Sequence, residues 1–347
     1  MNDPRNSLPD VIYAWDFSRW KHPVVRGFFS ATQVRFVRRA AQVKPGATLA
    51  LWGNRPVPEG VPADVRIIRL EDGFLRSVGL GADLIRPLSW VIDTRGLYYD
   101  ATRPSDLEAI LQTTAFDTDL LARAAQLRTR IVDTGLTKYN VGTRAWQRPH
   151  NQRQVILVPG QVESDASLAF GAPGLRTNLG LLKAVRAAQP DAWLVYKPHP
   201  DVLAGLRARG VGEDEAATWC DEQVTDVAMG DLLAQVDAVH VLTSLAGFEA
   251  LLRGRAVTCY GLPFYAGWGL TTDLFTCPRR TRSLTLDELV AGALLLYPAY
   301  LGLNSGRRVT PEQALDELLA WRTRTGAQLP WWRKALRVVL RRVVGVR

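Results

Sequence analysis

The chain has 347 residues, of which 47% are hydrophobic and 22% are charged. These are ordinary values for a globular protein, so they exclude a disordered or fibrous chain, and the length predicts about two domains. The three cysteines, Cys220, Cys259 and Cys277, form no CxxC pair, which argues against a disulfide framework and a structural zinc site. The first residues lack the apolar segment of a signal peptide, and no run of about 18 apolar residues occurs. We therefore expect a cytoplasmic protein without a membrane-spanning helix.

The apolar segments alternate between strand and helix patterns. Helical periodicity covers 178–188 and 245–252, and 284–295 and 311–322 are expected to form closing helices. This alternation predicts parallel sheets, and a break near 147–154 separates two sets of units. We predict an α/β fold of two Rossmann-like domains, 1–150 and 151–325, that face a central cleft, followed by a basic amphipathic helix over 326–347. Six segments have the composition of strands, each ending in a polar or glycine-rich turn: 47–52, 65–70, 155–158, 193–196, 238–242 and 257–260.

Ligands in such sheets bind beyond the carboxyl ends of the strands. The first polar cluster at such an end follows the segment 65–70 and contains Glu71, Asp72 and Arg76. Two adjacent acids are costly to bury unless they are paired. They either begin a helix, where acids are favourable, or act as a base or an acceptor-binding group. Arg76 could hold a carboxylate substrate by a two-pronged contact.

Two further clusters follow the third and fourth strand segments. The first contains Gln161 and Asp165 after a glycine turn. Asp165 is either a nucleophile toward an anomeric carbon or the N-cap of a helix. The second contains Lys197 and His199, and two prolines fix the backbone around the histidine. A cation and an imidazole presented together are suited to binding a phosphate or donating a proton.

The last clusters lie after the fifth and sixth strand segments. Thr243 and Ser244 can cap a helix whose exposed amides form an anion site, with or without a ligand. Glu249, one helical turn further on, could reach a ribose diol. Tyr265 belongs to an aromatic, glycine-rich stretch that either lines a sugar pocket or packs a loop. No P-loop or metal-ligand spacing occurs, and the DxD at 117–119 is a chance match because its surroundings are helix and loop.

The net charge of +9 is concentrated in the C-terminal tail. Apolar residues of this tail, including Trp331 and Trp332, fall near one helical face, which predicts a helix lying on an anionic membrane surface. The alternative is a helix packed on the body with solvated arginines. Nucleic acid is disfavoured because it would leave the apolar face exposed. Six basic residues and no acid lie in the last 17 positions: Arg333, Lys334, Arg337, Arg341, Arg342 and Arg347.

Taken together, the motifs resemble those of the retaining β-Kdo transferases of capsule polysaccharide assembly, the KpsC-type proteins. The resemblance covers roughly 40–320. It implies the GT-B-like architecture of glycosyltransferases, with an acceptor-side domain followed by a domain that binds a CMP-sugar. Members typically carry two such modules in tandem, whereas this chain has room for one. The matching blocks are EDGFLRSVGLG (71–81), IDTRGLYYDATRPSDLE (92–108), GQVESDAS (160–167), YKPHPDV (196–202), TSLAGFEALLRG (243–254) and YGLPFYAGWGLTTD (260–273).

The resemblance also implies a reaction and its participants. The donor is CMP-Kdo, and the acceptor is a membrane glycolipid or a Kdo-terminated glycan, so the protein is expected at the inner face of the cytoplasmic membrane, with capsule-assembly proteins as possible partners. Asp165 is then the nucleophile, Glu71 the base with Asp72 as its rival, and His199 the group that assists the departing phosphate. Because a CMP donor lacks a pyrophosphate, no metal or other cofactor is expected. Substrate contacts are expected from Asp72, Arg76, Gln161, Lys197, Thr243, Ser244, Glu249 and Tyr265.

Two other functions remain open from the residues. A CDP-glycerol-type phosphotransferase could use a histidine and a serine-bearing phosphate site, but it has no need of Asp165 as a nucleophile. A non-catalytic component that binds or exports a capsule lipid would explain the basic tail, but it leaves the polar clusters idle. Binding of CMP would separate the transferase from these alternatives.

Overall fold

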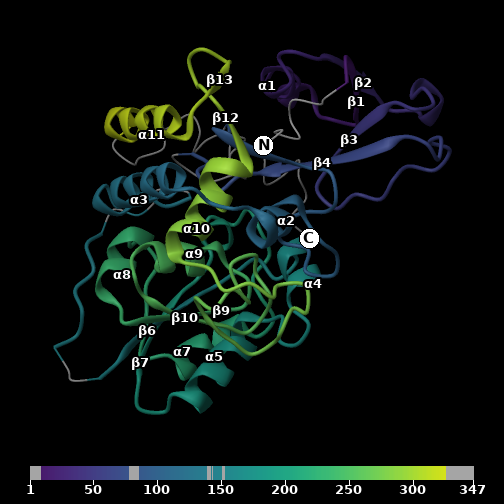
Figure 1. The fold of residues 1–347 in the computed structure, drawn as a ribbon. Helices are drawn as coiled ribbons and strands as arrows, with labels where there is room; N and C mark the ends of the chain where they lie inside the picture. Colours follow the sequence, from purple (N-terminus) through teal and green to yellow (C-terminus); the bar gives the residue numbers. More distant parts are fainter. Residues whose placement is uncertain (1–8, 78–85, 139–141, 143, 151–152, 326–347) are drawn as a thin grey trace.

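The computed structural model describes residues 9–77, 86–138, 142, 144–150 and 153–325. It has two α/β halves, each built on its own sheet, and they lie one above the other in Figure 1. Among the described residues, no helix combines the length and the apolar character needed to cross a lipid bilayer. The helix predicted over 326–347 lies outside the described residues.

The first sheet has seven strands in the order β13-β12-β5-β4-β3-β1-β2. Strands β1 to β4 run parallel to one another, β5 is antiparallel to both β4 and β12, and β13 is antiparallel to β12. The carboxyl ends of β1, β3 and β4 therefore lie at one edge of the sheet. The strands are β1 (Val11–Trp15), β2 (Gln33–Val37), β3 (Thr48–Trp52), β4 (Arg66–Asp72), β5 (Ser89–Asp93), β12 (Pro298–Leu301) and β13 (Arg308–Val309).

The second sheet has six parallel strands in the order β11-β10-β9-β6-β7-β8. Its central strand β6 is buried at every position, which explains its continuous apolar sequence, because parallel sheets are covered on both faces. The strands are β6 (Val155–Pro159), β7 (Trp193–Lys197), β8 (Glu222–Gln223), β9 (Ala238–Val241), β10 (Ala256–Cys259) and β11 (Thr272–Asp273). All six predicted strand segments are confirmed, two in the first sheet and four in the second.

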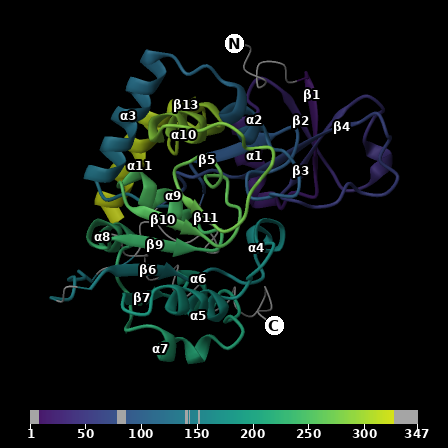
Figure 2. The same cartoon turned by 60° about the horizontal axis from the view of Figure 1, so that its bottom comes forward.

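The helices connect the strands and cover the sheets (Figures 1 and 2). The predicted helices over 178–188 and 245–252 are confirmed as α5 and α9, and the closing helices are α10, continued by a π-helical segment, and α11. The α-helices are α1 (His22–Phe28), α2 (Asp106–Thr113), α3 (Thr118–Asp133), α4 (Ala166–Gly171), α5 (Asn178–Ala188), α6 (Pro200–Leu203), α7 (Ala216–Trp219), α8 (Met229–Gln235), α9 (Leu245–Leu252), α10 (Leu286–Val290) and α11 (Pro311–Thr325). Short 3₁₀ segments are η2 (Arg19–Lys21), η3 (Ala40–Gln42) and η5 (Glu213–Glu215), and the π segment is η6 (Ala291–Leu296).

The C-terminal part of the chain returns to the first half. Strand β12 pairs with β5, and α11 lies beside α3 in both views, where Arg123 Nε donates to Glu312 Oε1 at 2.6 Å (Figures 1 and 2). The domain division at 150 remains a prediction. It places the strands of 298–309 in the second domain, whereas the structure has them in the first sheet. One hydrophobic core continues across both halves, with Leu127 of α3, Val155 of β6 and Trp268 as members.

Candidate active site

A cavity of about 620 Å³ lies between the halves, at the carboxyl ends of the parallel strands of both sheets. Strand β4 contributes to it from the first sheet, and the turns after β6, β7 and β9 contribute from the second. Within the described ranges, His, Cys, Asp and Glu form no group of three or more that could hold a metal ion. The structure brings ten of the eleven predicted site residues to this cavity: Glu71, Asp72, Arg76, Gln161, Asp165, Lys197, His199, Thr243, Ser244 and Glu249.

Glu71 and Asp72 end β4 and have different electrostatic surroundings. Neither residue begins a helix, and the prediction that the pair lies at a helix N-terminus is therefore wrong. Burial alone would raise the pKa of Asp72. However, the Arg76 guanidinium donates from Nε to Oδ2 of Asp72 at 2.6 Å, and lysines lie nearby. These positive charges outweigh the effect of burial and hold the pKa of Asp72 below its ordinary value. Burial and the Asp72 charge raise the pKa of Glu71 to about 7. Asp72 is thus a fixed anion, and Glu71 is the group that can take up a proton near neutral pH.

Asp165 is the N-cap of α4, as one of the two interpretations predicted. Its Oδ1 accepts a hydrogen bond from the Ser167 backbone N at 3.3 Å, while the residue stays exposed and lines the cavity. The cap fixes the position of the side chain, and it uses only one of the two carboxylate oxygens. The turn before it is tight, because a Cβ on Gly160 would come within 2.8 Å of the Tyr196 hydroxyl. Capping and cavity exposure therefore coexist at Asp165.

His199 faces the same cavity from the turn after β7. Its Nδ1 accepts a hydrogen bond from the Asp201 backbone N at 3.1 Å, which places the ring proton of the neutral imidazole on Nε2. Burial, followed by the charge of Lys138, lowers the pKa of His199 to about 4. The ring is therefore neutral at pH 7 and acts as an Nε2–H donor. Lys197 donates to the Val227 carbonyl at 2.7 Å, and burial lowers the pKa of its ammonium to about 8.

The N-terminus of α9 closes the other side of the cavity. Ser244 caps it by accepting from the Ala246 backbone N at 3.3 Å, which leaves the amides of the first turn directed at the cavity end of the helix. Thr243 is tied to Gln161, whose Nε2 donates to its Oγ1 at 3.0 Å. Glu249 lies one turn into α9, and burial raises its pKa to about 7. This arrangement can bind a phosphate next to a hydrogen-bonding carboxylate.

Tyr265 is the predicted site residue that the structure places elsewhere. It is fully buried, does not line the cavity, and donates its hydroxyl hydrogen bond to the Ser244 carbonyl. The prediction that Tyr265 contacts the substrate directly is therefore wrong, because its ring packs behind the N-terminus of α9. Its sequence neighbour Phe264 is the aromatic side chain of this loop that reaches the cavity.

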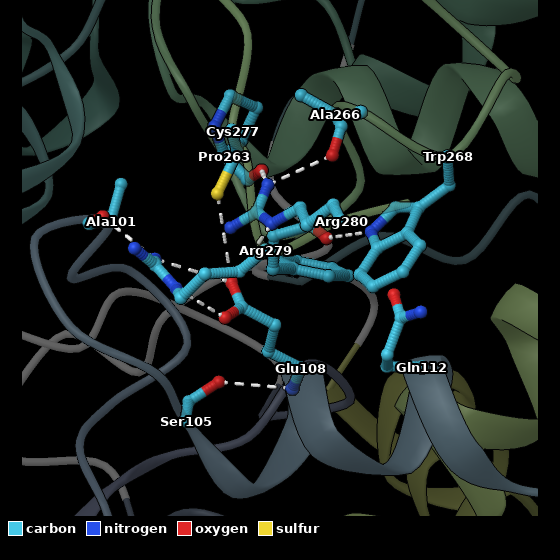
Figure 3. A network of polar contacts seen from close by, with 12 residues as sticks. Ala101, Ser105, Glu108, Gln112, Pro263, Ala266, Trp268, Cys277, Arg279 and Arg280 are labelled. Atoms are coloured by element: carbon cyan, nitrogen blue, oxygen red, sulfur yellow. Dashed lines mark hydrogen bonds and ion pairs between the residues drawn. The ribbon is translucent and has the colours of Figure 1, made fainter. Parts of the chain in front are cut away.

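The loop that carries Tyr265 is held by a buried ion-pair network (Figure 3). Arg280 Nη1 donates to the carbonyls of Pro263 and Ala266 at 2.6 and 2.8 Å, and its Nε donates to Glu108 of α2 at 3.0 Å. Arg279 donates to the other oxygen of Glu108 at 2.7 Å. Glu108 and Arg280 are both buried, so their charges depend on each other. The network fixes the 263–266 backbone against the first half of the molecule.

Several residues of the cavity wall were missed from the sequence. Lys138 contributes its backbone N, which donates to Glu249 Oε1 at 2.7 Å, and its side chain reaches the cavity. Tyr99 approaches Glu71, with its hydroxyl 3.4 Å from Oε2. No strand-end pattern precedes Lys138, whereas Tyr99 lies inside one of the family blocks quoted above. On the first half, Lys21 and Trp52 also line the cavity.

Comparison with known proteins agrees with this fold. The profile of the capsule polysaccharide biosynthesis proteins matches residues 59–306. The chain belongs to this family. The capsule polysaccharide modification protein LipA of Neisseria meningitidis is 42% identical in an alignment 329 residues long that covers 90% of this chain and 46% of LipA. The lipopolysaccharide-processing protein LpsZ of Rhizobium meliloti is 38% identical over 89% of this chain and 74% of its own length. The chain thus spans about half the length of LipA.

Two solved structures of Thermosulfurimonas dismutans KpsC share the architecture. The one titled beta Kdo 2,7 transferase is 41% identical, with a TM-score of 0.74 over 90% of this chain and 99% of its own. The one titled beta Kdo 2,4 transferase is 32% identical, with a TM-score of 0.75 over 88% of this chain and 97% of its own. The predicted KpsC-type resemblance and the GT-B-like fold of two Rossmann-like halves are confirmed.

Proposed function

We propose that this chain is a retaining β-Kdo transferase that moves Kdo from CMP-Kdo to a glycolipid or Kdo-terminated acceptor of a capsule or related surface polysaccharide. One observation carries the proposal. A carboxylate, a neutral imidazole and a helix N-terminus of the second half meet a proton-accepting carboxylate of the first half around one cavity. They do so in a chain that is 41% identical to a structure titled beta Kdo 2,7 transferase.

The donor is proposed to lie on the second half. Its single phosphate would accept hydrogen bonds from the α9 N-terminus, from Ser244 and Thr243, and from the Lys197 ammonium, while Glu249 would accept from the ribose hydroxyls. A phosphate here brings the leaving oxygen toward His199, whose Nε2–H would stabilise it as negative charge develops. Because these donors and the Lys197 charge can satisfy a single phosphate, the proposal includes no metal ion.

The chemistry then follows in two displacements. In the first, an Asp165 oxygen attacks the anomeric carbon of Kdo, the carbon–oxygen bond to the phosphate breaks, and CMP leaves with the bonding electrons. In the second, the acceptor hydroxyl attacks the same carbon, the bond to Asp165 breaks, and Glu71 takes the hydroxyl proton. Two inversions leave the β configuration of the donor in the product. The pKa of Glu71, near 7, suits this task, whereas Asp72 paired with Arg76 suits a charge-holding role.

The direct test is transfer by the purified chain. CMP-Kdo and a Kdo-terminated acceptor are incubated with the protein in EDTA, and the product linkage is assigned by NMR. We expect a β-linked Kdo and release of CMP. A protein that neither binds CMP nor consumes CMP-Kdo would contradict the proposal, and transfer of glycerol phosphate from CDP-glycerol would replace it with the phosphotransferase.

We also propose that the chain works at the inner face of the cytoplasmic membrane and that 331–347 attaches it there. The support is the sequence of this segment, which carries six basic residues and no acid. Each basic residue near anionic lipid contributes about 1 kcal/mol. Deleting 331–347 should abolish co-sedimentation with anionic vesicles and spare transfer to a soluble acceptor. Unchanged sedimentation would contradict this attachment.

A further inference from the structure

The first half of the molecule presents a cation and two indole rings to the cavity. Trp20 and Lys21 lie in η2, directly after β1, and Trp52 is the last residue of β3. Because β1, β3 and β4 are parallel neighbours, these residues lie at the same sheet edge as Glu71. All of them line the same cavity. The mechanism above uses only Glu71 from this group.

Lys21 packs against two aromatic rings. Its Nζ lies 3.2 Å from the ring centroid of Trp52 and 5.5 Å from that of Trp20. Among the described carboxylates, none lies within 4 Å of it. Burial, the largest influence, lowers its pKa to about 8, so the ammonium is still largely charged at pH 7. A half-buried cation whose donors face a cavity is suited to receive an anionic group.

Two other cations of the cavity, Arg76 and Lys197, already donate to acceptor atoms of the protein. Arg76 donates to Asp72, and Lys197 donates to the Val227 carbonyl. Lys21 therefore differs from both in having ring faces in place of an acceptor atom. An ammonium over an indole gains a cation–π attraction, but it keeps its N–H donors for a ligand.

The rings beside Lys21 indicate what kind of group carries the anion. Trp20 is 38% exposed, which is unusual for so large an apolar side chain, and Trp52 is half-buried against Trp90, with ring centroids 5.1 Å apart. Indole faces pack on the apolar face of a sugar ring. A ring surface with one cation at its side fits a sugar that bears an acidic group.

The charge of the surrounding chain has the same sign. No acid occurs from residue 17 to residue 58, and although Asp16 pairs with Arg38 and Arg55, this part of the first half keeps a net positive charge that favours anions. Eight basic residues lie in this stretch: Arg19, Lys21, Arg26, Arg35, Arg38, Arg39, Lys44 and Arg55.

We propose that Lys21, flanked by Trp20 and Trp52, is a specificity-determining subsite that binds the acidic group of the acceptor sugar and places its hydroxyl beside Glu71. The inference rests on the proposed transferase function and extends it, because it selects acidic acceptors over neutral ones. The same ammonium could meet a carboxylate of the acceptor sugar or a phosphate of its lipid anchor, and the experiment separates these two sources.

The test compares Lys21→Gln with Lys44→Gln, which removes the same charge from an exposed position of the same half. With a soluble Kdo-terminated acceptor that has no phosphate, Lys21→Gln should raise the acceptor KM by roughly 10- to 100-fold, the usual loss for a hydrogen bond to a charged group. The KM for CMP-Kdo should not change, whereas the pH profile should move to higher pH, because the Lys21 charge helps to lower the pKa of Glu71. Lys44→Gln should match the wild type. Converting the acceptor carboxylate to an amide should raise the wild-type KM and abolish the difference between wild type and Lys21→Gln.

The remaining outcomes of this experiment would each overturn the proposed subsite. A defect seen only with a phosphate-bearing lipid acceptor would assign Lys21 to the anchor and overturn the sugar-carboxylate subsite. An unchanged acceptor KM with a shifted pH profile would mean that Lys21 serves only to offset the charges of Glu71 and Asp72. If the wild type transfers no Kdo at all, the proposed function fails and the subsite fails with it. If the wild type transfers and Lys21→Gln behaves like it, the subsite alone fails.

Discussion

Asp165 and Asp117 form a natural pair for separating catalysis from helix capping. Both are exposed N-cap residues: Asp165 accepts from the Ser167 backbone N in α4, and Asp117 accepts from the Leu120 backbone N at 2.8 Å in α3. Only Asp165 lines the cavity. Substituting either one by alanine should cost about 1 kcal/mol of stability through the lost cap. Against a typical stability of about 5 kcal/mol or more, such a loss leaves more than ~99% of the protein folded.

Loss of a nucleophile has a far larger effect on rate. Asp165→Ala and Asp165→Asn should lower transfer on the order of 10⁴-fold or more, whereas Asp117→Ala should keep the wild-type rate. Asn caps helices as well as Asp does, so Asp165→Asn should also keep the wild-type melting temperature. The assays are kcat with CMP-Kdo, thermal unfolding, and CMP binding by calorimetry, which should be unchanged in all three variants. Transfer by Asp165→Asn at more than a tenth of the wild-type rate would refute the reasoning.

Five further substitutions test the rest of the site and the ion pairs outside it. Burial raises the pKa of Glu71 to about 7, and its base form is needed, so kcat should rise about tenfold from pH 6 to pH 8; Glu71→Gln should lose both the activity and this rise. His199→Ala should lower turnover by roughly 10²–10⁴-fold, and an unchanged turnover would leave His199 a structural residue. Because the pKa of Glu249 is near 7 and the ribose hydroxyls would bind its anion, CMP should bind up to about tenfold more tightly at pH 8 than at pH 6, and Glu249→Gln should remove this dependence in calorimetry. Glu108→Ala strands a buried arginine and should lower the free energy of unfolding in urea by about 3–5 kcal/mol, whereas Glu312→Ala, with its exposed partner, should cost less than about 1 kcal/mol.

The second half could be predicted well from the sequence because four of its six strands, β6, β7, β9 and β10, are largely apolar runs that end in polar turns. Such runs are the pattern of buried parallel strands, and each turn after one brings its residues to the same sheet edge. Gln161, His199 and Ser244 were found in this way, and they line the cavity as predicted. The site residues after β6, β7 and β9 follow from strand positions, whereas Tyr265, which follows β10, does not reach the cavity.

The first half was harder to predict because its strands have mixed composition. Strand β2 alternates exposed and partly buried positions before the buried Val37, with Arg35 at its centre. Strand β1 is an apolar run of the same length as β6, but it was not recognised as a strand. Because β1 was missed, nothing marked Lys21 as a residue at a strand end. The choice between Glu71 and Asp72 also required the structure, since it depends on where the Arg76 guanidinium lies. Strands β12 and β13 return to this sheet from far along the chain, which no local pattern indicates.

The most direct test of the account is intact-protein mass spectrometry after mixing with CMP-Kdo in the absence of acceptor. Glu71→Gln is the best protein for it, because loss of the base should slow the second displacement while leaving the first intact. We expect a mass increase of one Kdo residue, mapped by peptide sequencing to Asp165, with release of CMP, and no increase in Asp165→Asn. Transfer by the wild type without any adduct, or an adduct on a different residue, would contradict the account.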